Sequence, residues 1–282
     1  MTSLPGSPLK SHPQHHRPAP EDGAALLDAV EAHHRRFIAF PDDAAAVAVT
    51  LWVAHTHLLD AFESTPRLAF LSEPGSGKTR ALAVTGDLAP RAHAASGGSS
   101  ATLVRAVSGP GVRPTVLLDD INNLARSRTT ASEELRGLIN AGHRRTGTVL
   151  RCTGRDHTQE VQALPVYFAL AIASTNDLPN AVMSRSVVIR MRRASGASVA
   201  DYNPRRADGH ALRDRLATWA DSVRDELDVW PELPDGINDR PADVWEPLLA
   251  VADAAGGHWP ERARAACVQL TTASNAPTGQ AG

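Results

Sequence analysis

A short glycine-rich segment, residues 72–79, constrains the fold of this chain more than any other part of its sequence. It reads Ser-Glu-Pro-Gly-Ser-Gly-Lys-Thr and follows an apolar run, residues 67–71, that is typical of a buried strand. Residues 79–84 then have the pattern of a helix. A strand, a glycine-rich turn and a helix in this order predict a loop whose backbone N–H groups surround a phosphate at a helix N-terminus.

The residue types in this loop fit a nucleoside triphosphate. Glycines permit the positive φ angles that bring backbone N–H groups close to phosphate oxygens, Lys78 can reach the β- and γ-phosphates, and Thr79 can bind Mg²⁺. Ser72 stands where the motif usually has glycine, and the Gly-Lys-Thr ending argues against a turn that only joins strand to helix. We expect nucleotide contacts from Glu73, Pro74, Gly75, Ser76, Gly77, Lys78, Thr79 and Arg80.

A second apolar run, residues 114–118, ends in two carboxylates, Asp119 and Asp120. A continuous apolar run is typical of a central parallel strand. We expect Asp119 to hold Mg²⁺ together with Thr79, and Asp120 to orient the attacking water. Most ATPases of this build have Glu at the second position, so the shorter Asp120 predicts slow hydrolysis. The alternative is that the two aspartates only cap the next helix.

A third apolar run, residues 166–176, also ends in polar residues. In AAA+ ATPases an Asn at the tip of this neighbouring strand contacts the γ-phosphate and the lytic water, and Asn176 resembles that sensor. Arg185, just before the expected strand 186–191, resembles an arginine finger that acts on the ATP of an adjacent subunit. A solvated arginine beside a strand is the alternative for Arg185.

Several further segments are similar to a domain-of-unknown-function family of P-loop, AAA+-like ATPases from bacteria, phages and mobile elements, often associated with primase-helicase replication proteins. The segments are residues 134–145, 178–179, 185–193, 239–249 and 254–264. The similarity extends over about residues 65–270. The resemblance implies a P-loop fold and ATP chemistry. Asp120 and the AAA+-like ending at residues 174–176 depart from the pattern of that family.

After residue 193 the pattern becomes helical, with expected helices at residues 211–229, 241–255 and 260–271. They resemble the small lid of AAA+ proteins, in which a basic residue near a helix start approaches the γ-phosphate. Arg240, directly before a proline, is the candidate for that second sensor, and an exposed arginine is the alternative. Trp245 and Trp259 are expected in the core of the lid rather than as platforms for bases.

Along the chain, these elements predict an α/β fold. We expect a doubly wound, mainly parallel sheet with helices on both faces, plus a C-terminal helical lid. The predicted units are a disordered leader (1–21), an N-terminal helical segment at the sheet edge (22–64), the ATPase core (65–195), the lid (196–272) and a disordered tail (273–282). The leader contains clustered histidines, for which metal binding is the less favoured reading.

Composition narrows the setting in which the chain works. Its 282 residues carry a formal net charge of −2, so any contact with DNA must be local. Cys152 and Cys267 have no metal-ligand spacing and are expected to be buried, reduced thiols. Neither a membrane-spanning run nor a secretory leader is recognisable, which predicts a cytoplasmic location.

One basic segment stands out against this balanced charge. His143, Arg144, Arg145 and Arg151 flank a hairpin turn expected at residues 146–150. They could grip DNA phosphates in the pore of a ring, contact ATP of a neighbouring subunit, or form an ordinary solvated face.

Two function classes follow from these predictions. The first is an oligomeric, ATP-hydrolysing, helicase-like motor or loader that acts on single-stranded DNA or a replication protein. The second is a slow nucleotide-dependent switch that binds a partner protein without moving DNA. Both need ATP and Mg²⁺, and stimulation of hydrolysis by single-stranded DNA distinguishes them.

Overall fold

A five-stranded parallel sheet forms the centre of the molecule, in the order β2-β3-β6-β1-β7. The computed structural model describes residues 21–95, 100–109, 111–119, 121, 129–153, 160–193, 199–206 and 209–275. The strands are β1 (Arg67–Leu71), β2 (Ala92–Ala95), β3 (Thr115–Asp119), β6 (Ala169–Ser174) and β7 (Ser186–Arg190).

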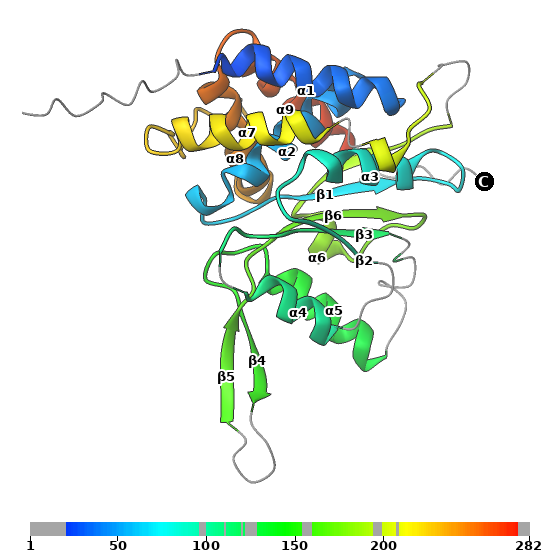
Figure 1. The fold of residues 1–282 in the computed structure, drawn as a ribbon, viewed down its shortest axis with the longest axis vertical. Coiled ribbons are helices and arrows are strands. Elements are labelled where there is room, and N and C mark those ends of the chain that lie inside the picture. The colour runs from blue at the N-terminus through cyan, green and yellow to red at the C-terminus, as the bar shows by residue number, and fades with distance from the viewer. Residues whose placement is uncertain are drawn as a thin grey trace, which may run out of the picture.

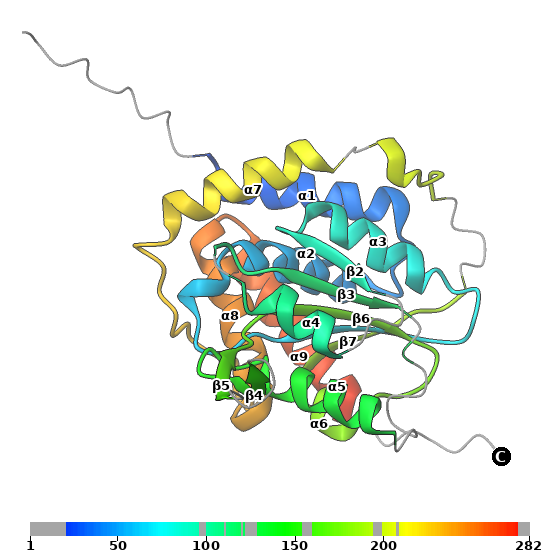
Figure 2. The same cartoon turned by 60° about the horizontal axis from the view of Figure 1, so that its bottom comes forward.

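Helices cover both faces of the sheet, as Figures 1 and 2 show. One face carries α1 (Gly23–Phe37), α2 (Asp43–His57), α3 (Lys78–Leu88), α7 (His210–Val223), α8 (Asp239–Ala255) and α9 (Trp259–Asn275). The other face carries α4 (Ser100–Val107), α5 (Thr130–Ala141) and α6 (Asn180–Met183). Two short 3₁₀ helices, η1 (Leu59–Ala61) and η3 (Pro204–Arg206), lie in connections.

The alternation of side chains along β1 explains why two layers of helices are needed. Leu68 and Phe70 are buried in the core beneath the six-helix layer, whereas Ala69 and Leu71 are buried in the core beneath α4, α5 and α6. Successive side chains of a strand point to opposite faces, so an entirely apolar strand must be covered twice. The predicted doubly wound, parallel α/β architecture is confirmed at this level.

The terminal helices differ from the prediction. Helices α1 and α2 belong to the helical layer over one face of the sheet rather than to its edge, and they share one core with α7, α8 and α9. Ion pairs fasten this layer: Arg262 of α9 contacts Glu31 of α1 at 2.6 Å and Asp43 of α2 at 3.2 Å. The apolar faces of α8 and α9 pack against α2. The lid-like helices and the N-terminal helices therefore form one packed layer.

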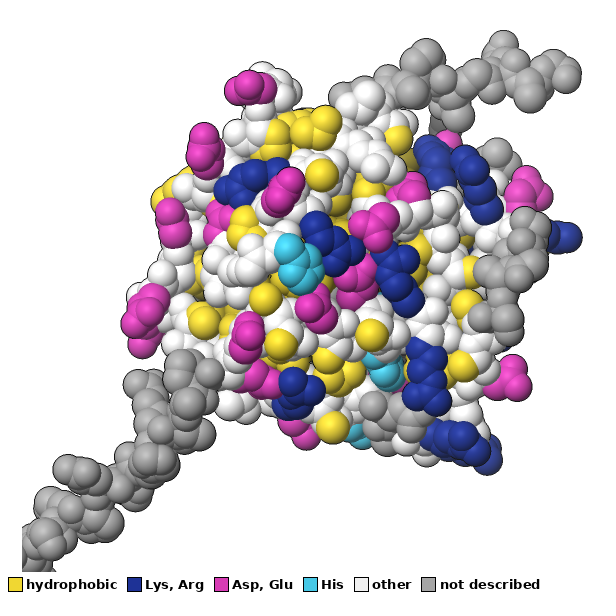
Figure 3. Space-filling view, turned by 90° about the horizontal axis from the view of Figure 1, so that it is seen from above, with side chains coloured by type: hydrophobic (Ala, Val, Ile, Leu, Met, Phe, Trp, Pro, Cys, Tyr) yellow, Lys and Arg dark blue, Asp and Glu magenta, His cyan; other side chains and the backbone are white. Residues whose placement is uncertain are grey.

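The two tryptophans of the lid-like helices α8 and α9 are core residues, as predicted. Trp245 is 3% exposed and Trp259 is fully buried. The outer surface of the layer carries interspersed basic and acidic side chains rather than a patch of one sign (Figure 3). Among the described helices, none combines the length and the apolar composition that a membrane span requires.

The hairpin is longer than the predicted turn at residues 146–150. It consists of β4 (Thr148–Thr153) and β5 (Glu160–Pro165), paired antiparallel, and it projects from the body of the molecule (Figure 1). Leu150 is 67% exposed on one hairpin face, while Val149 packs toward α5 on the other. Both cysteines are free, but Cys152 on β4 is exposed, which corrects the expectation that both thiols are buried; Cys267 is buried.

Candidate nucleotide-binding site

The glycine-rich segment forms the expected turn between β1 and α3. Gly75 and Gly77 have φ angles of +81° and +90°, a backbone conformation that side chains with a Cβ rarely adopt. Helix α3 begins at Lys78, directly after Gly77. The loop therefore presents a helix N-terminus at the carboxyl edge of the sheet, where anions bind well.

Lys78 is held by carbonyl oxygens of its own loop. Its Nζ donates to the oxygen of Ser72 at 2.5 Å and to that of Glu73 at 2.8 Å. Ser72 in turn makes a hydrogen bond from its hydroxyl to that of Ser76, a cross-loop contact that glycine at this position could not make. The lysine is buried, with 8% of its surface exposed, so its positive charge lies within the loop rather than in solvent.

A cavity of about 540 Å³ lies at this edge of the sheet. Asp119 contributes to its wall from the end of β3, in register with Ala173 of the adjacent β6. The full lining is Pro74, Gly75, Gly77, Lys78, Thr79, Asp119, Ala173, Ser174 and Thr175. Thr79 and Asp119 thus face one space, and a hydroxyl with a carboxylate fits Mg²⁺, which takes few protein ligands and keeps several waters.

The sensor candidate Asn176 and the other predicted residues of the loop lie around this cavity. Asn176 comes directly after Thr175, which lines the cavity. The backbone N–H of Asn176 donates to the Ser174 hydroxyl at 3.2 Å. Arg80 is exposed in the first turn of α3, and Glu73 and Ser76 border a second cavity on the outer side of the loop. Asp120 lies outside the described residues, so its role as the water-orienting carboxylate stays a prediction.

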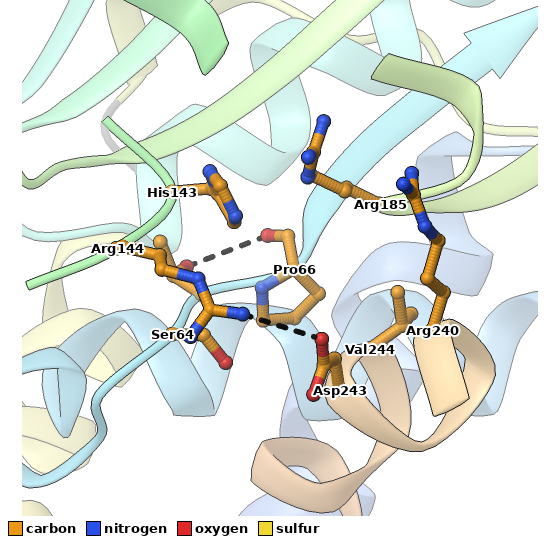
Figure 4. Close-up of a pocket in the computed structure, with 9 residues that line it drawn as sticks. Ser64, Pro66, His143, Arg144, Arg185, Arg240, Asp243 and Val244 are labelled. Carbon is orange, nitrogen blue, oxygen red and sulfur yellow. Dashed lines mark hydrogen bonds and ion pairs between the residues drawn. The ribbon is translucent and has the colours of Figure 1, made fainter. Parts of the chain in front are cut away.

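A separate, smaller cavity of about 120 Å³ gathers several basic side chains (Figure 4). Arg144, Arg185 and Arg240 line it, and a single carboxylate, Asp243, lies among them. Asp243 contacts Arg144 at 3.6 Å and also acts to raise the pKa of Arg185, so one carboxylate faces three arginines in this cavity. Burial and the neighbouring guanidinium groups of Arg240 and Arg144 lower the pKa of Arg185, as expected for crowded cations.

The two cavities lie at opposite ends of the strands. The backbone N–H of Arg67, the first residue of β1, donates to the carbonyl oxygen of Arg185, whereas the phosphate loop follows the last residue of β1. Five residues of strand span about 16 Å. Arg185 is therefore too far away to reach the phosphate loop of its own chain.

Arg240 lines the same cavity as Arg185, away from the phosphate loop of its own chain, so its predicted contact with a γ-phosphate stays a prediction. Its Nη1 donates to the hydroxyl of Ser184 at 2.8 Å. Helix α8 begins at Asp239, and its packing against α2 and α9 brings this helix start to the end of the sheet remote from the phosphate loop.

The predicted basic segment does not form a continuous cationic stripe. Arg145 contacts Glu63 at 3.4 Å, Arg151 contacts Glu134 at 3.5 Å, and Arg144 contacts Asp243. Burial lowers the pKa of His143 to about 4, so this histidine is neutral at pH 7. Each of the three arginines thus has a carboxylate partner, which reduces the charge that the segment offers to a phosphate backbone.

Sequence reasoning missed one arginine at the phosphate loop. Arg193, three residues after β7, donates from Nη2 to the carbonyl oxygen of Pro74 at 3.1 Å. Because β7 and β1 are parallel neighbours, the chain leaving β7 emerges at the same edge as the loop. The run Arg190-Met191-Arg192-Arg193 is visible in the sequence, but only the strand order shows which end of the sheet it reaches.

Comparisons with known proteins agree with part of the predicted resemblance. Residues 190–281 match a family model described as "Protein of unknown function (DUF3631)". This stretch begins at the last residue of β7 and excludes the phosphate loop, so the similarity predicted over residues 65–270 is supported only from residue 190 onward. The family description assigns no activity.

One curated relative is similar over a short stretch. It is the "Uncharacterized 28.9 kDa protein in xis 5'region" of Saccharopolyspora erythraea, 49% identical over 82 residues. The match covers 28% of this chain and 30% of the relative.

Two solved structures resemble the whole chain loosely. A full-length MCM homolog from Methanopyrus kandleri has a TM-score of 0.48 at 14% identity, with 92% of this chain and 62% of that chain covered. The active helicase Cch of SCCmec type IV has a TM-score of 0.44 at 13% identity, with 90% and 49% covered. This chain spans less than two thirds of each of them.

Proposed function

We propose that this protein binds ATP with Mg²⁺ at the cavity of the phosphate loop and hydrolyses it. The observation that carries the proposal is the convergence of Lys78, Thr79 and Asp119 on one space, beside a helix N-terminus and two glycines with positive φ. A structural turn would need neither the buried lysine nor the facing carboxylate. Together they supply a cation for phosphate oxygens and two oxygen ligands for a metal.

In this mechanism Lys78 exchanges the carbonyl oxygens of Ser72 and Glu73 for oxygens of the β- and γ-phosphates. Thr79 and Asp119 hold the metal ion, which when bound neutralises charge on the phosphates. Asp120 and Asn176 orient the attacking water. The short side chain of Asp120 keeps turnover slow.

Arg185 and Arg240 complete the site of a second copy of the chain. They lie about 16 Å along β1 from their own phosphate loop, and they share a cavity with one carboxylate. An excess of positive charge at a surface cavity is suited to an anion, and the anion of the proposed reaction is the γ-phosphate of a neighbour. The active form is therefore an oligomer in which each ATP lies between two copies.

The protein uses this ATP hydrolysis in DNA metabolism, where it acts as a helicase-like motor or loader. This part of the proposal rests on the family resemblance, and a relative named after a xis 5' region agrees with it. The carboxylate partners of Arg144, Arg145 and Arg151 favour the second candidate, a slow switch that binds a partner protein without moving DNA.

Equilibrium ATP binding tests the proposal. The Lys78→Ala variant removes charge-assisted contacts worth about 1.5–3 kcal/mol, which weakens ATP binding roughly 10- to 150-fold. Arg205→Ala, which removes one exposed positive charge on η3, serves as the control and binds like the wild type. Equal affinity in the Lys78→Ala protein would contradict the site. Stimulation of hydrolysis by single-stranded DNA then supports the motor, and its absence supports the switch.

A further inference from the structure

An arginine outside the predicted site touches the turn of the phosphate loop. Nη2 of Arg193 lies 3.1 Å from the carbonyl oxygen of Pro74. A Cβ added to Gly75 would lie 3.6 Å from the same nitrogen, so the guanidinium lies directly against the glycine of the turn. Arg193 therefore contacts the part of the loop that surrounds phosphate oxygens.

The charge of Arg193 faces a neutral partner. Arg190, at the end of β7, contacts Asp177 at 3.2 Å, whereas no carboxylate pairs with Arg193 among the residues that the structure describes. A guanidinium offers five N–H donors and binds planar or tetrahedral anions through two of them at once. A cation without an ion pair of its own, beside a cavity proposed to bind phosphate, is suited to a phosphate oxygen.

The position of Arg193 allows this contact without a change of the fold. Its side chain lines a cavity of about 430 Å³ on the outer side of the loop, together with Ser72, Glu73 and Ser76. Pro74 and Gly75, which Arg193 touches, line the phosphate cavity itself. Arg193 is exposed, so rotation about its side-chain bonds carries the guanidinium from one side of the turn to the other.

We propose that Arg193 is a nucleotide-contacting residue of its own chain. When a nucleoside triphosphate binds, its guanidinium exchanges the carbonyl oxygen of Pro74 for oxygens of the β- and γ-phosphates. This inference rests on the proposed function. It assigns a second cation of the same chain, besides Lys78, to the phosphates, while Arg185 and Arg240 act from the neighbouring copy.

Binding of ATP, ADP and AMP to the full chain tests this role. Arg193→Ala is expected to weaken ATP and ADP binding about tenfold or more, because a charge-assisted contact is lost, and to leave AMP binding unchanged. Arg193→Lys keeps the positive charge but places its N–H donors on a single nitrogen, so it is expected to recover only part of the lost affinity. Arg205→Ala, the charge-matched control on η3, binds all three nucleotides like the wild type. Thermal unfolding shows that each variant is folded.

The outcomes separate this inference from the proposed function. Equal weakening for the three nucleotides would overturn it, because Arg193 would then only support the loop, and unchanged ATP binding would also overturn it. In both cases the Lys78→Ala variant would still lose ATP, and the proposed function would stand. ATP binding that is insensitive to Lys78→Ala would overturn the proposed function and this inference with it.

Discussion

Arg240 donates a hydrogen bond of 2.8 Å to the hydroxyl of Ser184, the residue directly before Arg185. The start of α8 is thereby joined to the end of β7 that lies remote from the phosphate loop. Two cations predicted to act on a γ-phosphate, Arg185 as an arginine finger and Arg240 as a second sensor, lie in the same cavity. They are expected to act as a pair on one phosphate group.

This pairing predicts a specific kinetic pattern for Arg240→Ala. Turnover falls about tenfold or more, because transition-state charge loses a donor, while ATP affinity of the isolated chain stays unchanged. Arg185→Ala gives the same pattern. Binding by titration and steady-state hydrolysis measure the two quantities separately. A variant that loses affinity as an isolated chain would place Arg240 at its own nucleotide after all.

The two aspartates after β3 are expected to separate metal binding from hydrolysis. Asp120→Asn retains ATP and lowers turnover about 100-fold or more, because the water loses its orienting carboxylate. Asp119→Asn also raises the Mg²⁺ concentration needed for half-maximal activity. Asp120→Glu speeds hydrolysis if the short side chain limits the rate. A rate that falls in Asp120→Glu would show that the site is built around aspartate.

Two buried histidines and one half-buried histidine predict a loss of stability in mild acid. Burial lowers the pKa of His34 and His55 to about 3 and that of His57 to about 4, from 6.5. The unfolded chain therefore binds protons more readily. Stability is fully present above pH 6.5, and each histidine removes about 1.4 kcal/mol per pH unit as the pH falls from there toward its folded pKa.

Urea unfolding over this pH range measures the effect. The His57→Gln variant makes the decline of the unfolding free energy shallower, because one of the titrating groups is removed. His210→Gln, at an exposed position on α7, leaves the slope as in the wild type. A wild-type protein whose unfolding free energy does not change between about pH 7 and 5 would contradict buried neutral histidines.

Which site residues could be predicted depends on how far apart in the sequence the residues that position them lie. The phosphate loop and Asp119 are set by a few adjacent residues, the apolar strand before them and the glycines or carboxylates that follow, so sequence alone locates them. The locations of Arg193 and Arg240 depend on which end of a strand or helix meets which end of the sheet. That is decided by packing between residues far apart in the chain, and no local pattern reports it.

The same distinction applies to the fold. Strands with continuous apolar runs were predictable, whereas β2, with the sequence Ala-His-Ala-Ala, has too weak a pattern and becomes a strand by pairing with β3. The lid-like helices were predicted as helices from their spacing, with ends that differ by a few residues. Their packing on α2 was not predictable, because α2 is buried almost all round and its sequence does not indicate a partner.

The central claim is that one ATP site is shared between two copies, with Lys78 from one and Arg185 from the other. Mixing Arg185→Ala chains, which keep the phosphate loop, with Lys78→Ala chains, which keep the arginine, tests it directly. Each variant alone hydrolyses ATP more slowly than the wild type, and hydrolysis by the mixture is expected to recover in part, because one mixed interface joins an intact loop to an intact arginine. No recovery in oligomers shown to be mixed, or full activity in a strictly monomeric protein, would contradict the shared site.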